Sequence, residues 1–222
     1  MKLFVVPTPI GNLADMTYRA VQVLQQVDCI LCEDTRTSGV LLKHYNITTS
    51  TRSFHQHNEH HSTPKIIDEI VAGRQFAIIS DAGTPGISDA AYLLIRACVQ
   101  HNIQVECLPG ATALVPAVVS SGIPCDAFTY LGFLPQKKGR HTLFTALASH
   151  AYTIVFYESP HRLAKTLTEL CTYFGNERQV CVARELSKKF EEYKRGTIQE
   201  LAAFYTEHGI KGEVVVVVEA VA

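Results

Sequence analysis

The sequence predicts an α/β protein, and three observations support this fold class. Short apolar runs typical of buried strands alternate along all 222 residues with segments of helical periodicity. Polar or small residues repeatedly follow these runs, and open α/β sheets place ligand-binding groups at the carboxyl ends of their strands. The unbroken valine run at residues 214–218 is typical of a strand covered on both faces. We therefore expect two α/β domains, residues 1–121 and 122–222, the first with a mainly parallel sheet.

The first expected domain has strand-like runs at residues 3–6, 28–31, 52–54, 76–79 and 103–108. Helices are expected from Asp15 or Thr17 onward, and then at residues 37–45, 62–72, 92–102 and 111–121. Pro64 would lie in the first turn of its helix, where proline is well tolerated. Residues 120–124, Ser-Ser-Gly-Ile-Pro, break the last of these helices, and we place the domain boundary there.

The second expected domain has strands at residues 128–133, 153–157, 179–183 and 214–218. Its helices are expected at residues 142–149, from Pro160 to Gly175 with Ser159 as the cap, and at 197–207. Residues 193–196 would lead directly into the last helix. In each domain the polar residues after the strands would gather at one sheet edge, which predicts a ligand cleft between the domains.

The densest group of turn-forming residues follows the strand-like run 76–79. It reads Ser-Asp-Ala-Gly-Thr-Pro-Gly-Ile-Ser-Asp over residues 80–89. Gly83 and Gly86 permit backbone angles or close approaches that a Cβ would prevent, and Ser88 or Asp89 would cap the next helix. The segment is either a ligand loop or a well-made strand–helix connection. Its length favours the ligand loop.

The chain is close to neutral, with a formal net charge of −1 and an isoelectric point of about 6.8. Any nucleic-acid site must therefore be a local basic patch. No apolar run is long enough to cross a bilayer, and no signal peptide is evident. The 7 scattered cysteines indicate reduced thiols. We expect a cytoplasmic protein without membrane contact.

Two motifs have the spacing of metal sites, but neither predicts a bound metal. Cys29-x-x-Cys32 lies in an expected strand, where positions three apart face opposite sides. The histidine-rich segment 55–61 has no complementary cysteine or carboxylate pattern. We interpret it as a surface or RNA-facing patch, with a neutral loop as the alternative.

Several nucleotide and hydrolase motifs are absent from the sequence. There is no G-x-G-x-x-G after the first strand and no G-x-x-x-x-G-K-[ST], which weighs against a dinucleotide fold and a P-loop. No G-x-S-x-G elbow occurs, which weighs against an α/β-hydrolase. The small-residue loops are poor in Lys and Arg, so they suit a ligand with little negative charge.

The order of the loop motifs resembles the tetrapyrrole-methylase superfamily, the class III S-adenosylmethionine methyltransferases, over essentially the whole chain. The motifs begin at Val6 (Val-Pro-Thr-Pro-Ile-Gly-Asn-Leu), Glu33 (Glu-Asp-Thr-Arg), Ser80 (the loop above), Leu108 (Leu-Pro-Gly-Ala), Glu158 (Glu-Ser-Pro-His-Arg) and Ala183 (Ala-Arg-Glu-Leu-Ser-Lys). The second, third, fifth and sixth motifs are similar to those of the subgroup that methylates the 2′-oxygen of a cytidine ribose in 16S ribosomal RNA. Many members of that subgroup carry a further small domain after the last strand.

This resemblance implies a mixed sheet in the second domain, S-adenosylmethionine as the methyl donor, 16S ribosomal RNA in the small ribosomal subunit as the substrate, and a homodimer. The donor contacts that it implies are Pro9, Ile10, Asp81, Gly83, Thr84, Ile87, Ala111, Thr112, Leu186 and Gly212.

A ribose hydroxyl is a weak acid, so its methylation benefits from a base or a nearby cation. The candidates near the expected cleft are Glu33, Asp34, Glu158, Glu185 and Lys188. The pattern does not choose among them, and each is alternatively a helix cap or an ion-pair partner. The segment Glu33-Asp34-Thr35-Arg36, for example, is equally well interpreted as a functional site or as a helix cap with a local ion pair.

RNA binding requires a basic lining. The candidates are Arg36, Arg52, Lys137, Lys138, Arg162, Arg184 and Lys189, with a solvated face as the alternative. Two other functions remain open. One is C-methylation of a corrin or porphyrin precursor, and the other is a non-catalytic donor- or RNA-binding module.

Overall fold

The computed structural model describes residues 1–221. They form two compact units, Met1–Thr112 and the described residues from Ala113 onward, each with its own five-stranded sheet. We call them the N-terminal and C-terminal units and describe each by itself. The chain passes between the units just before helix α5 (Leu114–Ser121) and not after residue 121. The physical reason is that α5 packs on strands of the C-terminal unit and buries Ala117 and Val118 there.

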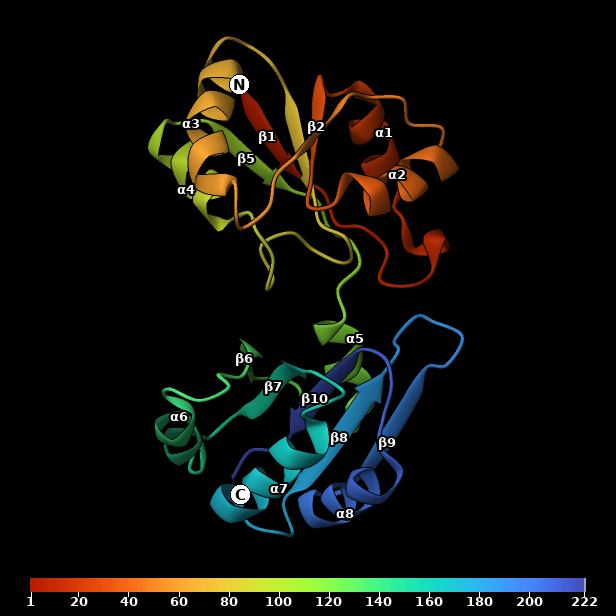
Figure 1. The fold of residues 1–222 in the computed structure, drawn as a ribbon, viewed down its shortest axis with the longest axis vertical. Helices are drawn as coiled ribbons and strands as arrows, with labels where there is room; N and C mark the ends of the chain where they lie inside the picture. Colours follow the sequence, from red (N-terminus) through yellow and green to blue (C-terminus); the bar gives the residue numbers. More distant parts are fainter. Residues whose placement is uncertain (222) are drawn as a thin grey trace. The chain divides into compact units, whose positions relative to one another are not determined.

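The N-terminal unit is a doubly wound parallel sheet with strand order β3-β2-β4-β1-β5 (Figure 1). Its strands are β1 (Lys2–Val5), β2 (Cys29–Cys32), β3 (Thr51–Ser53), β4 (Phe76–Ile79) and β5 (Gln104–Cys107). Its helices are the 3₁₀ turn η1 (Leu13–Asp15), α1 (Tyr18–Gln26), α2 (Thr35–His44), α3 (Glu59–Val71) and α4 (Tyr92–Gln100). As expected from the sequence, the first sheet is parallel.

Alternation along the strands divides the core of this unit into two layers. Cys29 and Leu31 of β2 pack with α3 and α4, whereas Ile30 and Cys32 pack with α1 and α2. Figure 1 shows these helix pairs on opposite sides of the sheet. The expectation that Cys29 and Cys32 face opposite sides is confirmed, because the two thiols belong to different core layers.

The C-terminal unit has a mixed sheet with order β6-β7-β10-β8-β9, in which only the β6–β7 pair is parallel. Its strands are β6 (Phe128–Phe133), β7 (Thr153–Glu158), β8 (Gln179–Arg184), β9 (Glu192–Thr197) and β10 (Val214–Val218). Helices α6 (Arg140–Leu147), α7 (Leu163–Phe174) and α8 (Ile198–His208) share one core with the sheet.

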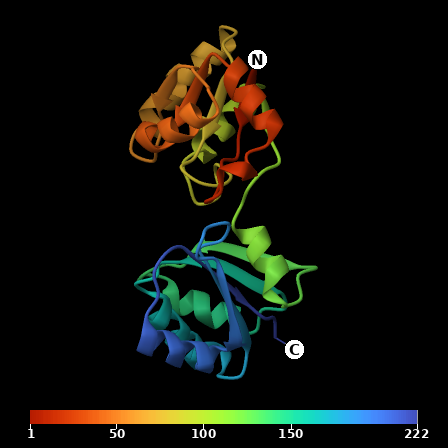
Figure 2. The same ribbon diagram turned by 90° about the vertical axis from the view of Figure 1, so that its right-hand side faces the viewer.

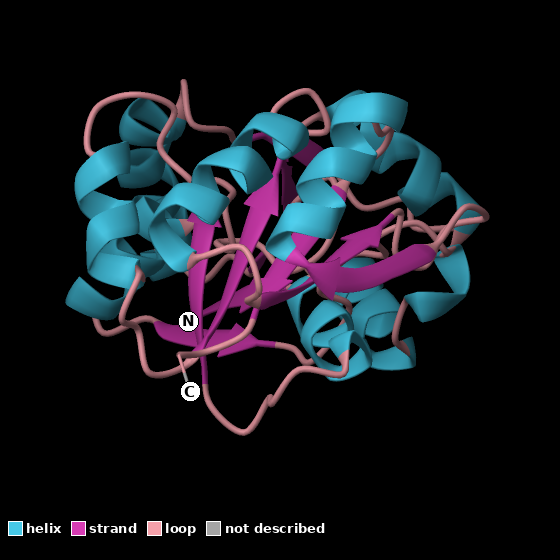
Figure 3. Cartoon of the chain, turned by 90° about the horizontal axis from the view of Figure 1, so that it is seen from below, coloured by secondary structure: helices cyan, strands magenta, loops and turns pink. Residues whose placement is uncertain are grey.

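Helix α5 covers the other face of this sheet, as the turned view in Figure 2 shows. Colouring by secondary structure in Figure 3 shows helices flanking the strands. All five valines of β10 are buried between these layers, which confirms the expectation of a strand covered on both faces. The mixed sheet implied by the family resemblance is likewise present.

Four local expectations were wrong. Helix α3 begins at Glu59 and contains Pro64 in its interior, because the Asn58 carbonyl already accepts the Ser62 amide (2.9 Å). Neither Ser88 nor Asp89 caps α4; Ala91 occupies that position without a side-chain hydrogen bond.

The other two errors lie in the C-terminal unit. Residues 159–162 form a turn before α7, in which the Ser159 carbonyl accepts the Arg162 amide (2.9 Å), so Ser159 does not cap the helix. Strand β9 was not expected at all. Its charged sequence pairs with β8 along the sheet edge, and that long-range pairing leaves no local apolar pattern.

Candidate functional site

In the N-terminal unit, the loops that follow β1, β2, β4 and β5 meet at the carboxyl edge of the parallel sheet. The Thr8 amide donates to the Gly83 carbonyl and the Gly83 amide to the Thr8 carbonyl, both at 2.9 Å. The buried Thr8 hydroxyl donates to the Ser80 carbonyl at 3.0 Å. These bonds tie the first motif to the central motif.

The loop after β5 joins the same group. The Thr84 hydroxyl donates to the Ala111 carbonyl at 3.0 Å. A Cβ on Gly110 would lie 2.6 Å from Cβ of Pro7, so this close approach requires glycine. Gly83 has a φ of 85°, and its Cα faces Ile10 and Ala111. The edge therefore brings together the loops that carry the donor contacts expected in this unit: Pro9, Ile10, Asp81, Gly83, Thr84, Ile87, Ala111 and Thr112.

Three acidic residues, Glu33, Asp34 and Asp81, are hydrogen-bonded to one another at this edge. The Asp81 carboxylate accepts the Asp34 amide at 3.2 Å, and the Glu33 carboxylate accepts the Asp81 amide at 3.4 Å. Burial, followed by the charges of Glu33 and Asp81, raises the pKa of Asp89 to about 7. Sequence reasoning treated Asp89 only as a cap; the signal available was the second Ser-Asp pair of the central motif.

Asp34 has a structural role. Its carboxylate accepts the backbone amide of Arg36 at 2.8 Å as the N-cap of α2, and it pairs with the Arg36 guanidinium at 2.7 Å. These hydrogen bonds hold the pKa of Asp34 down at about 2. A carboxylate with so low a pKa is a poor proton acceptor at neutral pH.

In the C-terminal unit, β7 and β8 end at the same sheet edge, where β10 begins. Val214 is paired with Glu158 on one side and with Arg184 on the other. Strand β6 runs parallel to β7 and also ends there, with Phe133 opposite Tyr157. The polar motifs after these strands are therefore neighbours.

Glu185, Lys188 and Glu213 form a tight charged turn at this edge. Lys188 Nζ contacts Glu185 at 2.9 Å and Glu213 at 3.0 Å, and Glu185 also accepts the Glu213 amide at 2.9 Å. The Glu213 amide and Lys188 lower the pKa of Glu185. Burial lowers the pKa of Lys188, but its hydrogen bonds to the two carboxylates outweigh burial and raise it. Neither group is suited to take a proton.

Gly212 has a φ of 92° and lies against this turn, because a Cβ there would come within 2.5 Å of the Glu185 carboxyl group. Leu186 is buried. Gly212 thus has a structural reason to be glycine, and its expected role in donor binding stays a prediction, as does that of Leu186.

The expected RNA contacts fall into two groups. The arginines have partners within the chain: Arg36 pairs with Asp34, Arg52 with Glu69 (2.8 Å), Arg162 with Glu158 (2.6 Å) and Arg184 with Glu192 (3.0 Å). Within the described residues, the lysines Lys137, Lys138 and Lys189 form no ion pair and are exposed. The lysines are therefore the more available phosphate contacts.

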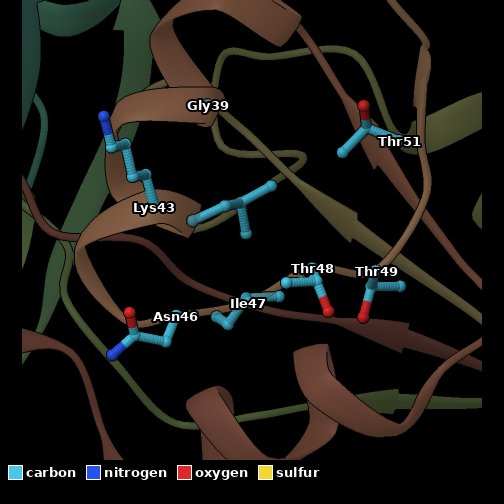
Figure 4. A pocket seen from close by; sticks show the side chains of 8 residues that line it. Gly39, Lys43, Asn46, Ile47, Thr48, Thr49 and Thr51 are labelled. Carbon is cyan, nitrogen blue, oxygen red and sulfur yellow. The ribbon is translucent and has the colours of Figure 1, made fainter.

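A hollow of about 390 Å³ lies in the N-terminal unit between α2 and the segment that leads into β3. Figure 4 shows Lys43 on the helix and Asn46, Ile47, Thr48 and Thr49 on that segment. The hollow is at the amino end of β3.

Two absences apply to residues 1–221. No group of three or more His, Cys, Asp or Glu side chains there could hold a metal ion, and the histidine-rich segment mainly forms the approach to α3 and its first turn. Within that same range, no helix is both long and apolar enough to span a membrane.

Comparison with known proteins agrees with this architecture. The sequence model of the tetrapyrrole (corrin/porphyrin) methylases matches residues 2–202. Ribosomal RNA small subunit methyltransferase I of Synechocystis sp. is 50% identical over 217 residues, which cover 97% of this chain and 78% of that protein. The protein of that name from Streptococcus pyogenes serotype M3 is 46% identical over 217 residues, 97% of this chain and 75% of that protein.

Solved structures share the fold at low identity. A diphthine synthase matches with a TM-score of 0.75 at 10% identity, over 99% of this chain and 90% of that one. Cobalt precorrin-4 methyltransferase matches with a TM-score of 0.72 at 18% identity, over 98% and 94%. Uroporphyrin-III C-methyltransferase from Thermus thermophilus, complexed with S-adenosyl homocysteine, matches with a TM-score of 0.67 at 14% identity, over 99% and 97%.

The fold is thus that of the tetrapyrrole methylases. The chain belongs to the tetrapyrrole methylase family and, within it, to the family of ribosomal RNA small subunit methyltransferase I.

Proposed function

We propose that the protein is an S-adenosylmethionine-dependent methyltransferase that methylates the 2′-oxygen of a cytidine ribose in 16S ribosomal RNA of the small subunit. The observation that carries the proposal is the loop cluster of the N-terminal unit, taken together with relatives at 50% and 46% identity that are named for ribosomal RNA methylation. A homodimer and a cytoplasmic location accompany the proposal as expectations.

The residues of the N-terminal edge fit a cationic donor. Residues 6–17, 80–91 and 108–113 contain no Lys or Arg, while Glu33, Asp81 and Asp89 supply negative charge. S-adenosylmethionine supplies a sulfonium-activated methyl group when bound. The task of the chain is then to hold donor and ribose in line and close together, which accounts for a large part of the barrier lowering in such reactions. Loops tied to each other by backbone bonds are suited to that alignment.

Glu33 is the proton acceptor we propose for the ribose hydroxyl. Of the candidates expected from the sequence, Asp34 is tied to Arg36, Glu185 and Lys188 hold each other, and the Glu158 side chain is fully buried. The Glu33 carboxylate accepts a long hydrogen bond, 3.4 Å from the Asp81 amide, and no Lys or Arg among residues 1–221 pairs with it. Glu33→Gln should lower kcat by about 10²–10⁴-fold with little change in donor affinity.

Two measurements test the proposed function. Calorimetric titration with S-adenosylmethionine measures donor binding, and transfer of a tritiated methyl group to purified 30S subunits measures catalysis. Resistance of the modified RNA to alkaline cleavage at one nucleotide would locate the methyl group on a 2′-oxygen. Donor binding without transfer to 30S subunits would contradict the proposal and favour a non-catalytic module.

The alternative of C-methylation on a tetrapyrrole precursor has one observation in its favour, the fold shared with cobalt precorrin-4 methyltransferase at 18% identity. Incubation with a porphyrinogen precursor and tritiated donor separates the alternatives. Incorporation into the macrocycle and not into RNA would replace the proposed function by this one.

A further inference from the structure

Glu158, at the end of β7, is the most enclosed charged side chain of the C-terminal edge. Its side chain has 0% exposure, and its carboxylate accepts three donors. These are the Ser159 amide at 2.7 Å, the Thr166 hydroxyl at 2.7 Å and Arg162 Nη2 at 2.6 Å. A carboxylate so enclosed cannot reach a substrate proton, so it needs another reason to be there.

Burial of a carboxylate is expensive unless its partners are well placed. One partner, Arg162, is itself incompletely bonded. Its Nη2 contacts Glu158, but its Nη1 is buried without a hydrogen-bond partner in the described part of the chain. A guanidinium presents its donors as a planar fork that matches the oxygens of a phosphate. Glu158 therefore fixes the place of the Arg162 side chain, which remains 25% exposed and can present its guanidinium to a phosphate.

The other partner, Thr166, extends the network to the basic turn after β6. The Thr166 hydroxyl donates to Glu158 and accepts from Arg140 Nη2 at 2.8 Å. Arg140 also bonds Glu169 through Nε (2.6 Å) and the Pro135 carbonyl through Nη1 (2.9 Å). The contact with Pro135 closes residues 135–140 into a turn that carries the exposed side chains of Lys137 and Lys138.

We infer that Glu158 is a positioning residue for RNA: through Arg162 and through Thr166–Arg140 it sets the places of two phosphate-binding elements, the Arg162 guanidinium and the Lys137–Lys138 turn. This inference rests on the proposed RNA substrate. It assigns Glu158 to substrate recognition, in contrast to its expected role as a catalytic candidate.

Glu158→Gln tests the inference directly. The amide offers one accepting oxygen in place of two, so either Arg162 or Thr166 loses its acceptor. We expect KM for 30S subunits to rise about tenfold, kcat to stay within about twofold, and the affinity for S-adenosylmethionine to be unchanged. A catalytic base would instead show a loss of about 10²–10⁴-fold in kcat, and that outcome would overturn the inference.

Variants of Thr166 separate the connection of Glu158 to Arg140 from its connection to Arg162, and they leave the buried charge in place. Thr166→Val should cut the link to Arg140 and raise KM for RNA about threefold, whereas Thr166→Ser should restore the wild-type value. Thr168→Val is the matched control in the same helix, because within residues 1–221 its hydroxyl hydrogen-bonds the Ala164 carbonyl and no other group. Equal effects of the two valine variants would mean a general disturbance of α7 and would contradict a positioning role.

RNA binding is also measured apart from methyl transfer, by fluorescence anisotropy of a single-stranded RNA oligonucleotide in increasing salt. Glu158→Gln should flatten the logarithmic salt dependence by about one to two phosphate contacts. This readout remains informative if the wild-type protein transfers no methyl group to 30S subunits, which would refute the proposed function alone. An unchanged salt slope in a folded Glu158→Gln protein would refute the positioning role.

Discussion

At the carboxyl edge of the N-terminal sheet, backbone and hydroxyl hydrogen bonds join the loops, whereas at the matching edge of the C-terminal sheet ion pairs join them. Thr8 and Gly83 exchange amide bonds at the first edge, while Lys188 pairs with Glu213 at the second. The loops after β1, β4 and β5 carry no Lys or Arg, which suits the first edge to a cationic donor. Ion pairs give the second edge fixed basic groups suited to a polyanion.

The two edges should differ most in how salt concentration changes the affinity for their ligands. If Lys137, Lys138, Arg162 and Lys189 each meet a phosphate, RNA binding should weaken about 50-fold between roughly 50 and 200 mM salt. Donor binding should change less than about threefold over the same range, because it depends on short-range contacts. Anisotropy and calorimetry measure the two affinities. Equal salt responses would remove the distinction between the edges.

Gly110→Ala should damage the first edge specifically. The added Cβ would lie 2.6 Å from the rigid ring of Pro7, and overpacking of this kind costs about 1–3 kcal/mol. We expect donor affinity to fall about tenfold while RNA binding stays within about twofold, measured by the same two titrations. A parallel loss of RNA binding would show that the edges are not independent.

The pH dependence of stability should have opposite signs at the two edges. The pKa of Asp89 is raised to about 7 from 3.8, so its stabilising contribution is complete below about pH 3.8 and is lost as pH rises to about 7. Asparagine at position 89 cannot ionise. Between pH 5 and pH 8, the free energy of unfolding of Asp89→Asn should therefore rise by about 1–2 kcal/mol relative to that of the wild type, a value reduced for solvent screening.

The pKa of Glu185 is lowered from 4.5, so its contribution is present above pH 4.5 and is lost as pH falls through the lowered pKa. Glu185→Gln should therefore lower the free energy of unfolding more at neutral pH than at acid pH. Urea unfolding across the pH range measures both effects. A gain for Asp89→Asn at pH 5 as large as at pH 8 would contradict the assignment.

Gly39→Ala is the smallest expected effect and the control for Gly110. Gly39 lies inside α2, and a Cβ there would meet no atom within 4 Å. Alanine in an open helical position stabilises by about 0.5–1 kcal/mol, so the melting temperature should rise slightly with both affinities unchanged. A loss of donor affinity would mean that α2 takes part in the first edge.

Local signals predicted most of the elements. The β10 valines indicated a doubly covered strand, and Thr17 does cap α1, where its hydroxyl accepts the Ala20 amide at 3.1 Å. Strand β9 (Glu192–Thr197) was not predicted, because its charged residues form a strand by pairing with β8. The early start of α3 was missed because Pro64 resembles a first-turn proline.

The amino-acid order by itself determined the alternation of strands and helices, the glycine-rich loops at strand ends and the family. Only the tertiary structure decided what each charged side chain does. Glu33, Asp34, Glu158 and Glu185 all follow strand-like runs in the sequence, yet within residues 1–221 the last three pair with arginine or lysine, whereas Glu33 accepts a long hydrogen bond from a backbone amide. The reason is that an ionisable group takes its role from neighbours within a few ångströms, and folding brings those neighbours from distant parts of the chain.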